Sequence, residues 1–328
     1  MEKTGKKVLL SGVKPTGRPH IGNYFGAMRQ FVELQNSHES FVFIADLHAL
    51  TTVQNAEELR QNILDVALDY LAIGLDPKKV TLFKQSDVPA HTELGWIFNC
   101  ITTMPYLERA HAYKDAVAKG REVNVGTFDY PMLMAADILL YDADVVPVGA
   151  DQKQHVEYAR DTAEKFNRIF GPKGGSAGAS DTFKLPESLI IENVKIVPGV
   201  DGQKMSKSYN NIIPLFASDE EIKKAVMSIV TDSSGDVPKN VYAIHELIRD
   251  KKSLDALYEE KKGKYKDLKE ALIADLISFI APLREKREAL AKDTKKVLEN
   301  IESGGEKARE RAEAKMEMVR EKIGVKLY

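Results

Sequence analysis

The sequence contains one cysteine, one tryptophan and no long apolar run. The single cysteine, Cys100, excludes a disulfide within the chain and any zinc or iron–sulfur site built from cysteines. No apolar stretch approaches the roughly 18–20 residues that a membrane-spanning helix needs. Residues 1–7 are polar and basic, and they lack the apolar region of a signal peptide. We therefore expect a cytoplasmic protein that has no membrane partner.

The sequence also has little net charge, because 47 Lys and Arg oppose 49 Asp and Glu. The charges are unevenly distributed. Residues 251–328 hold 20 basic and 16 acidic side chains, whereas the first 250 residues hold 27 and 33. A basic C-terminal region is a weak indication of a polyanionic partner, and a solvated helical surface of mixed charge is the alternative. With 328 residues and 43% hydrophobic side chains, the chain can bury a sizeable core in two domains.

Short apolar runs alternate with helical patterns along the first half of the chain. Residues 8–10, 41–44 and 80–83 read as strands, and residues 57–72 read as a helix that stops at Gly74. This alternation predicts a parallel sheet with crossover helices, which binds ligands at the carboxyl ends of its strands. We expect further helices from near Pro89, from Pro131 to residue 141 and at 151–170, and a strand at 194–197. From residue 241 onward the pattern predicts helices, and Gly304 and Gly305 set the last of them apart.

The segment between the first strand and the first helix, residues 15–23, reads PTGRPHIGN. Gly22 lets a flat ring or a phosphate approach the backbone, and the helix start offers unpaired N–H groups to an anion. His20 and Asn23 are three residues apart, so both can point at one bound group. An ordinary strand-to-helix turn is the alternative, because such turns also use Gly, Pro and Asn.

A second segment, residues 204–208, reads KMSKS and follows the glycine-rich sequence GVDGQ. Lys204 and Lys207 could together offset the charge of a triphosphate. A solvated basic loop is the alternative for this segment taken alone. The two segments in this order resemble the paired signatures of class I aminoacyl-tRNA synthetases.

A third segment, residues 130–141, narrows the resemblance. Asp137 stands among Ala, Ile and Leu, and shares one helical face with Tyr130, Met134 and Tyr141. A carboxylate in such surroundings needs a donor, which could be a ligand N–H, or an Arg or backbone N–H in a purely structural role. With residues 145–155, VVPVGADQKQH, this segment is similar to bacterial-type tryptophanyl-tRNA synthetases, and the likeness extends over nearly the whole chain.

The resemblance implies an ATP-dependent activation of tryptophan followed by transfer to tRNA(Trp). It implies an α/β fold, with a Rossmann-like parallel-sheet catalytic domain at 1–192, a strand and KMSKS loop at 193–215, and an all-helical anticodon-binding domain at 216–328. The last helix, from about 306, would pack back on the catalytic domain. It also implies a homodimer, Mg²⁺ carried on the ATP phosphates rather than by a protein metal site, and no DNA partner.

The resemblance assigns roles residue by residue. The catalytic residues would be His20, Asn23, Lys204, Ser206, Lys207 and Ser208. The ATP site would consist of Lys14, Pro15, Thr16, Gly22, Asn23, Gly149, Ala150, Asp151, Ile196, Lys204, Met205, Ser206, Lys207 and Ser208. The tryptophan site would consist of Leu10, Tyr130, Met134, Asp137, Val146, Val148 and Gln152, with Asp137 accepting the indole N–H.

Several positions depart from the common bacterial pattern, among them Lys14, which stands where Gln is usual, and Ala150, which stands where Glu is usual. Three other functions remain open from the residues. A tyrosyl-specific enzyme would share the fold and the chemistry. A small nucleotidyltransferase would lack the helix that carries Asp137. A non-catalytic paralogue could bind tryptophan or tRNA without activating the amino acid.

Overall fold

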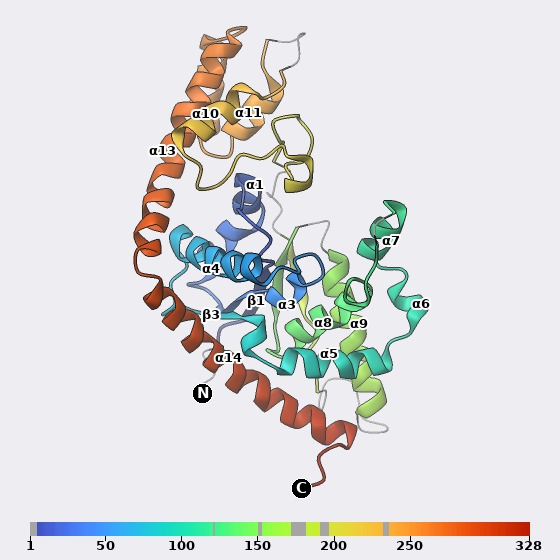
Figure 1. Cartoon of the computed structure of the whole chain (residues 1–328). Coiled ribbons are helices and arrows are strands. Elements are labelled where there is room, and N and C mark those ends of the chain that lie inside the picture. Colours follow the sequence, from blue (N-terminus) through green and yellow to red (C-terminus); the bar gives the residue numbers. More distant parts are fainter. Residues whose placement is uncertain (1–4, 121, 150–152, 172–181, 191–196, 232–235) are drawn as a thin grey trace.

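The computed structural model describes residues 5–120, 122–149, 153–171, 182–190, 197–231 and 236–328, and a five-stranded sheet lies at its centre (Figure 1). The strands are all parallel, in the order β3-β2-β1-β4-β5. Their bounds are β1 Val8–Val13, β2 Glu39–Ile44, β3 Val80–Lys84, β4 Val145–Val148 and β5 Glu187–Ile190. The predicted α/β class and the first three predicted strands are confirmed, while residues 194–196 lie outside the described residues.

Helices connect the strands and then form the whole C-terminal part of the described chain. The connecting helices are α1 Ile21–Asn23, α2 Arg29–Leu34, α3 Asp46–Ala49, α4 Ala56–Ile73, α5 Ala90–Ile101, α6 Met104–Leu107, α7 His111–Ala118, α8 Val125–Leu139 and α9 Lys153–Phe170. A π-helical turn at Tyr24–Met28 and a 3₁₀ turn at Gln85–Asp87 supplement them. The C-terminal helices are α10 Asp219–Met227, α11 Lys239–His245, α12 Lys251–Glu260, α13 Tyr265–Ala291 and α14 Thr294–Ile323.

The two faces of the sheet form two separate apolar cores, because successive strand side chains point to opposite faces. Val42 and Ile44 of β2 pack with α4 and continue into the core of the C-terminal helices. Phe41 and Phe43 pack on the other face with α5, α8 and α9. Both faces of the strands are therefore buried, as expected for a parallel sheet.

The strand order reverses between β1 and β4, since β2 follows β1 on one side and β4 lies on the other. At such a point the connections after the two central strands diverge, which leaves a crevice at their carboxyl ends. The segments that follow β1 and β4 are residues 14–20 and Gly149, and both belong to the segments singled out from the sequence. None of the described helices is long and apolar enough to cross a membrane.

The prediction that a helix starts at Pro131 is wrong. Helix α8 starts at Val125, where the Asn124 side chain accepts a hydrogen bond from the Thr127 N–H at 2.8 Å, and Pro131 lies inside the helix. The N-terminal cap and the burial of Met132, Ala135 and Ala136 outweigh the one backbone hydrogen bond that proline removes.

The prediction that Gly304 and Gly305 set off a last helix is also wrong, because α14 runs through both residues. Helix α14 passes β3 along the edge of the sheet (Figure 1). A Cβ at position 304 would overlap the Leu82 carbonyl oxygen, and one at 305 would lie 3.0 Å from Asp87. The glycines thus allow close contact between the helix and the strand rather than ending the helix.

Replacing Gly304 by alanine is expected to lower the free energy of unfolding by about 1–3 kcal/mol, through overpacking against Leu82. The sign of this change in stability is informative, because replacing glycine by alanine in an exposed helix instead stabilises the helix by up to about 1 kcal/mol. Urea unfolding of Gly304→Ala beside Ser303→Ala, an exposed neighbour in α14, measures the difference. Equal stability of the two variants would contradict the proposed close contact.

Candidate active site

A cavity of about 390 Å³ opens at the carboxyl ends of β1 and β4. Six of the predicted tryptophan-site residues line it, namely Leu10, Tyr130, Met134, Asp137, Val146 and Val148. Phe31, Phe43 and Ile138 add apolar surface, and Gly149 and Lys14 also belong to the lining. We call this space the switch-point cavity. It is an apolar pocket with a few polar groups, which is typical of a small-molecule site.

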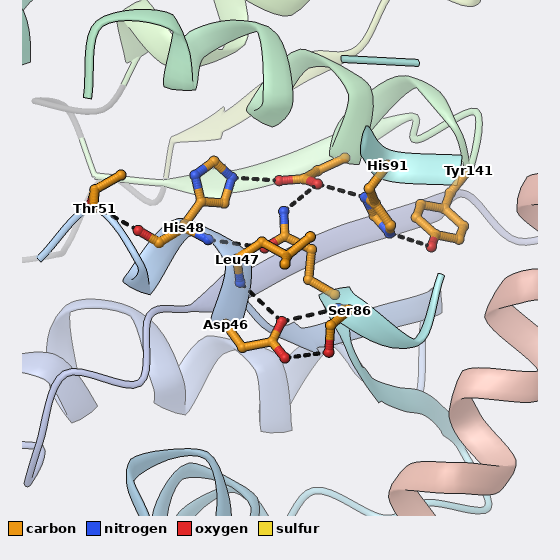
Figure 2. Close-up of polar contacts among 9 residues, drawn as sticks. Asp46, Leu47, His48, Thr51, Ser86, His91 and Tyr141 are labelled. Atoms are coloured by element: carbon orange, nitrogen blue, oxygen red, sulfur yellow. Dashed lines mark hydrogen bonds and ion pairs between the residues drawn. The ribbon is translucent and has the colours of Figure 1, made fainter. Parts of the chain in front are cut away.

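The carboxylate of Asp137, in α8, accepts three hydrogen bonds from protein side chains. One oxygen accepts from Nδ1 of His91 at 2.6 Å and from Nε2 of Gln85 at 2.8 Å. The other oxygen accepts from Nε2 of His48 at 2.8 Å. Figure 2 shows His48 and His91 pointing toward this carboxylate from opposite sides. The donors expected in a purely structural role were an Arg or a backbone N–H, whereas two histidines and a glutamine hold Asp137 here.

Charge keeps Asp137 ionised although the side chain is 1% exposed. Burial alone would raise the pKa of this carboxyl, but the charges and hydrogen bonds of His48 and His91 hold that pKa well below its usual range. Asp137 has no proton to donate near neutral pH. The remaining acceptor capacity of its oxygens is available only to a ligand that brings a donor.

The donors around Asp137 come from segments that follow β2 and β3. The backbone N–H of His48, in α3, donates to Oε1 of Gln85 at 3.3 Å. The carboxylate of Asp46 accepts from the N–H groups of Leu47 and Ser86, both at 3.0 Å, and so joins the same two segments (Figure 2). On the far side, Nε2 of His91 lies 2.9 Å from the Tyr141 hydroxyl.

Sequence reasoning missed His48, Gln85 and His91 as functional residues. The available signal was positional, because His48 and Gln85 come directly after strands whose carboxyl ends meet at one edge of the sheet. His48 also lines the switch-point cavity, and its Nδ1 is buried without a hydrogen-bond partner among the described residues.

A second cavity, of about 370 Å³, lies between the two signature segments and is called the loop cavity below. Its lining includes Thr16, His20 and Asn23 from the first segment and Ser206 and Lys207 from the second. Lys14 lines both cavities, so the two spaces are adjacent. Its Nζ lies 5.8 Å from the centre of the Tyr130 ring, and the Tyr130 hydroxyl lies 2.7 Å from Nε2 of His155.

His20 and Asn23 cap the first helical turn reciprocally. Nδ1 of His20 accepts from the Asn23 N–H at 3.2 Å, and Oδ1 of Asn23 accepts from the His20 N–H at 3.1 Å. A Cβ at Gly22 would lie 2.8 Å from Nδ1 of His20, so only glycine allows this close approach. Burial, and then the positive charge of Lys207, lower the pKa of His20 to about 4.

The KMSKS loop is docked on the first segment. Nζ of Lys207 donates to the carbonyl oxygens of Thr16 at 3.1 Å and Gly17 at 2.9 Å. Backbone hydrogen bonds join the Ile21 N–H to Ile213 O and the Leu215 N–H to Pro19 O, both at 3.0 Å. Residues far apart in sequence therefore form the walls of one cavity, as the paired motifs suggested.

Several predicted residues do not line either cavity or cannot be placed. Pro15, Gly22, Lys204, Met205 and Ser208 belong to the segments around the loop cavity but not to its lining. The side chain of Met205 is buried in the core, and the Ser208 hydroxyl lies 2.9 Å from that of Ser206. Ala150, Asp151, Gln152 and Ile196 lie outside the described residues. Within the described ranges, no group of three His, Cys, Asp or Glu could hold a metal ion.

Comparison with known proteins agrees with this geometry. The family model of class I tRNA synthetases (W and Y) matches residues 2–301. The chain is 48% identical to the tryptophan–tRNA ligase of Fusobacterium nucleatum over 327 residues, which cover 97% of this chain and 98% of the relative. A crystal structure of tryptophanyl-tRNA synthetase from Campylobacter jejuni, complexed with ADP and tryptophan, aligns with a TM-score of 0.87 and 42% identity over 97% of this chain and 99% of its own.

The fold and the family model thus define a class I tRNA synthetase of the tryptophan and tyrosine type. A tyrosyl-tRNA synthetase from Archaeoglobus fulgidus shares the fold, with a TM-score of 0.67 at 22% identity over 87% of this chain and 92% of its own. The tryptophan enzymes of Fusobacterium nucleatum and Campylobacter jejuni are much more similar to this chain, which belongs to the tryptophan–tRNA ligase family. The resemblance drawn from the motifs is therefore confirmed.

The geometry of His20 generates a pH prediction. Because its pKa lies near 4, the imidazole remains neutral at pH 6, with Nδ1 free to accept from Asn23. Removing the neighbouring charge in Lys207→Met should raise the His20 pKa, though not fully to its ordinary value, because burial is the larger cause. NMR titration of the ring measures both values, with Lys204→Met as the matched control. An ordinary histidine pKa in the wild type would contradict the geometry.

Proposed function

We propose that this protein activates L-tryptophan with ATP and transfers the tryptophanyl group to tRNA(Trp), releasing AMP and pyrophosphate. The single observation that carries the proposal is the adjacency of the two cavities, one containing a buried acceptor and the other the two signature segments. An amino acid in the first cavity would present its carboxylate toward a nucleotide in the second.

In the first step the tryptophan carboxylate attacks the α-phosphate of ATP, and the bond to the leaving pyrophosphate breaks. The reaction depends on positioning and charge stabilisation, so it requires no covalent enzyme nucleophile. His20 and Asn23 would hold the nucleotide, while Lys204, Lys207, Ser206 and Ser208 would stabilise the charge on the pyrophosphate. The ribose hydroxyl at the end of the tRNA then attacks the adenylate and releases AMP.

In the switch-point cavity, Asp137 would accept the indole N–H, and Leu10, Met134, Val146 and Val148 would enclose the ring. Tyr130 and Gln152 would meet the amino and carboxyl groups, while Gly149, Ala150, Asp151 and Ile196 would contact the nucleotide. Binding phenylalanine would leave the buried carboxylate without a ligand donor. Sites of this kind reject such an analogue by about 10⁴–10⁵-fold.

Tyrosine remains the competing substrate, because its phenol also carries a donor. The cavity favours indole, since mostly apolar walls surround the buried carboxylate of Asp137, and the chain is 48% identical to a tryptophan enzyme. A non-catalytic paralogue is less well supported, because His20, Lys204 and Lys207 are all present.

Further proposals concern the setting of the reaction. Mg²⁺ would enter with ATP as part of the substrate, held mainly by the phosphates. The helices of the 216–328 part would bind the anticodon region of the tRNA. The protein would act in the cytoplasm, which its single cysteine fits. It would act as a homodimer, because Trp96, Met104 and Val125 are large apolar side chains left exposed on neighbouring helices, and sedimentation equilibrium tests that state.

Exchange of labelled pyrophosphate into ATP, with each of the twenty amino acids separately, tests the proposal. We expect exchange with tryptophan alone, followed by charging of tRNA(Trp) when the tRNA is added. Lys207→Met, purified in the same way, should lose about a hundredfold or more of the rate, which excludes a contaminating host enzyme. Exchange with tyrosine instead would overturn the role of Asp137, and no exchange with any amino acid would favour the non-catalytic paralogue.

A further inference from the structure

Asp69 lies on the inner face of α4, outside every motif singled out from the sequence. Its side chain is 1% exposed. One carboxylate oxygen accepts a hydrogen bond from Nε of Arg287, in α13, at 2.5 Å. The other oxygen, Oδ2, is buried without a hydrogen-bond partner among the described residues. An unpaired buried acceptor is costly, so its retention calls for a functional explanation.

The position of Asp69 supplies that explanation, because the residue lines the loop cavity together with Lys207. Lys207 is exposed, and within the described ranges its Nζ donates to the backbone carbonyl oxygens of Thr16 and Gly17. Burial lowers the pKa of Lys207, and the negative charge of Asp69 is the opposing influence that raises it. The two charged groups thus attract each other across the cavity.

We propose that Asp69 is a positioning residue for Lys207: its carboxylate, in the lining of the same cavity, attracts the Lys207 ammonium group toward the loop cavity, while Arg287 anchors one carboxylate oxygen. An ammonium group directed into the loop cavity can stabilise the charge on pyrophosphate, so the carboxylate supports the function of the loop. Asp69 itself touches neither reacting atom in this scheme. The proposal rests on the proposed function only for the role of Lys207, because the attraction between the two groups is a property of the free protein.

Arg287 makes the arrangement compatible with a phosphate ligand. A bare carboxylate in the loop cavity would repel a triphosphate, but the guanidinium of Arg287 offsets its charge from behind. The same guanidinium donates to Asp65 at 2.5 Å and lies over the Phe216 ring, 5.4 Å from its centre. Arg287 thereby ties the loop cavity to α13, one of the two long helices of the C-terminal part (Figure 1).

Other titratable groups near Asp69 and Lys207 must keep the same protonation state in any test of this pair. Lys14 and His20 are the remaining titratable side chains in the described lining of the loop cavity. Burial raises the pKa of Asp69 to about 6, against the opposing effects of Arg287 and Lys207. Asp69 is therefore mostly ionised at neutral pH and loses its charge as the pH falls through that value.

The direct test is the pKa of Lys207 in the intact protein, measured by NMR on its terminal methylene and assigned with Lys207→Arg. Asp69→Asn retains the shape and an acceptor for Arg287 but removes the charge, and it should lower the pKa of Lys207. Asp65→Asn is the matched control, since Asp65 also binds Arg287 but is absent from the cavity lining. It should leave the Lys207 pKa unchanged.

Equal values in the wild type and in folded Asp69→Asn would overturn the proposal, and so would equal shifts in the two variants. If Asp69→Asn does not fold, Asp69→Glu and Asp65→Glu replace the pair, and only the former should move the Lys207 pKa. In pyrophosphate exchange, Asp69→Asn should move the basic limb of the pH profile downward with the KM for tryptophan unchanged. The NMR result does not depend on pyrophosphate exchange by the wild type. Failure of the proposed function can therefore be distinguished from failure of the proposal about Asp69 and Lys207.

Discussion

The structure of the site depends on one buried carboxylate. Asp137 is held by His48, Gln85 and His91, which come from three segments following two strands of the sheet. Each donor lowers the cost of burying the charge, and together they fix where the carboxylate stands at the base of the switch-point cavity. Removing one donor would leave a charge partly unpaired in an apolar surrounding. The hydrogen bonds to Asp137 therefore both hold the connecting helices together and keep a charged acceptor in the lining of the switch-point cavity.

A second constraint brings the two signature segments together. The chain after the KMSKS loop returns as Ile213 and Leu215 to pair with Ile21 and Pro19, which fixes the loop against the first helical turn. Lys207 and His20 consequently share the loop cavity, and the lysine charge helps to keep the histidine neutral. Lys14 lies between this space and the switch-point cavity. The switch-point cavity lies at the carboxyl ends of the sheet strands, and these long-range pairings hold the loop cavity beside it.

Much of this arrangement could be predicted from local sequence, and the failures have physical causes. The apolar strands and their alternation with helical patterns correctly predict the parallel sheet. The helical face shared by Tyr130, Met134 and Asp137 does line the switch-point cavity. The partners of Asp137 could not be assigned, because they are 46 to 89 residues away in sequence. Gly304 reads locally as a helix break, yet tertiary contact with Leu82 makes glycine the residue that the helix needs there. Pro131 likewise reads locally as the start of a helix, but the N-terminal cap and the buried residues of α8 allow the helix to begin earlier, at Val125.

The central claim is that Asp137 recognises the indole N–H of tryptophan within a preformed apolar cavity. Calorimetric binding of tryptophan and of its benzothiophene analogue, which replaces the N–H by sulfur in a ring of similar shape, tests it most directly. Because the buried carboxylate would be left without the ligand donor, the analogue should bind more weakly by about 1–3 kcal/mol or more. Equal affinity of the two ligands would contradict the account, since shape and apolar contact alone would then explain recognition.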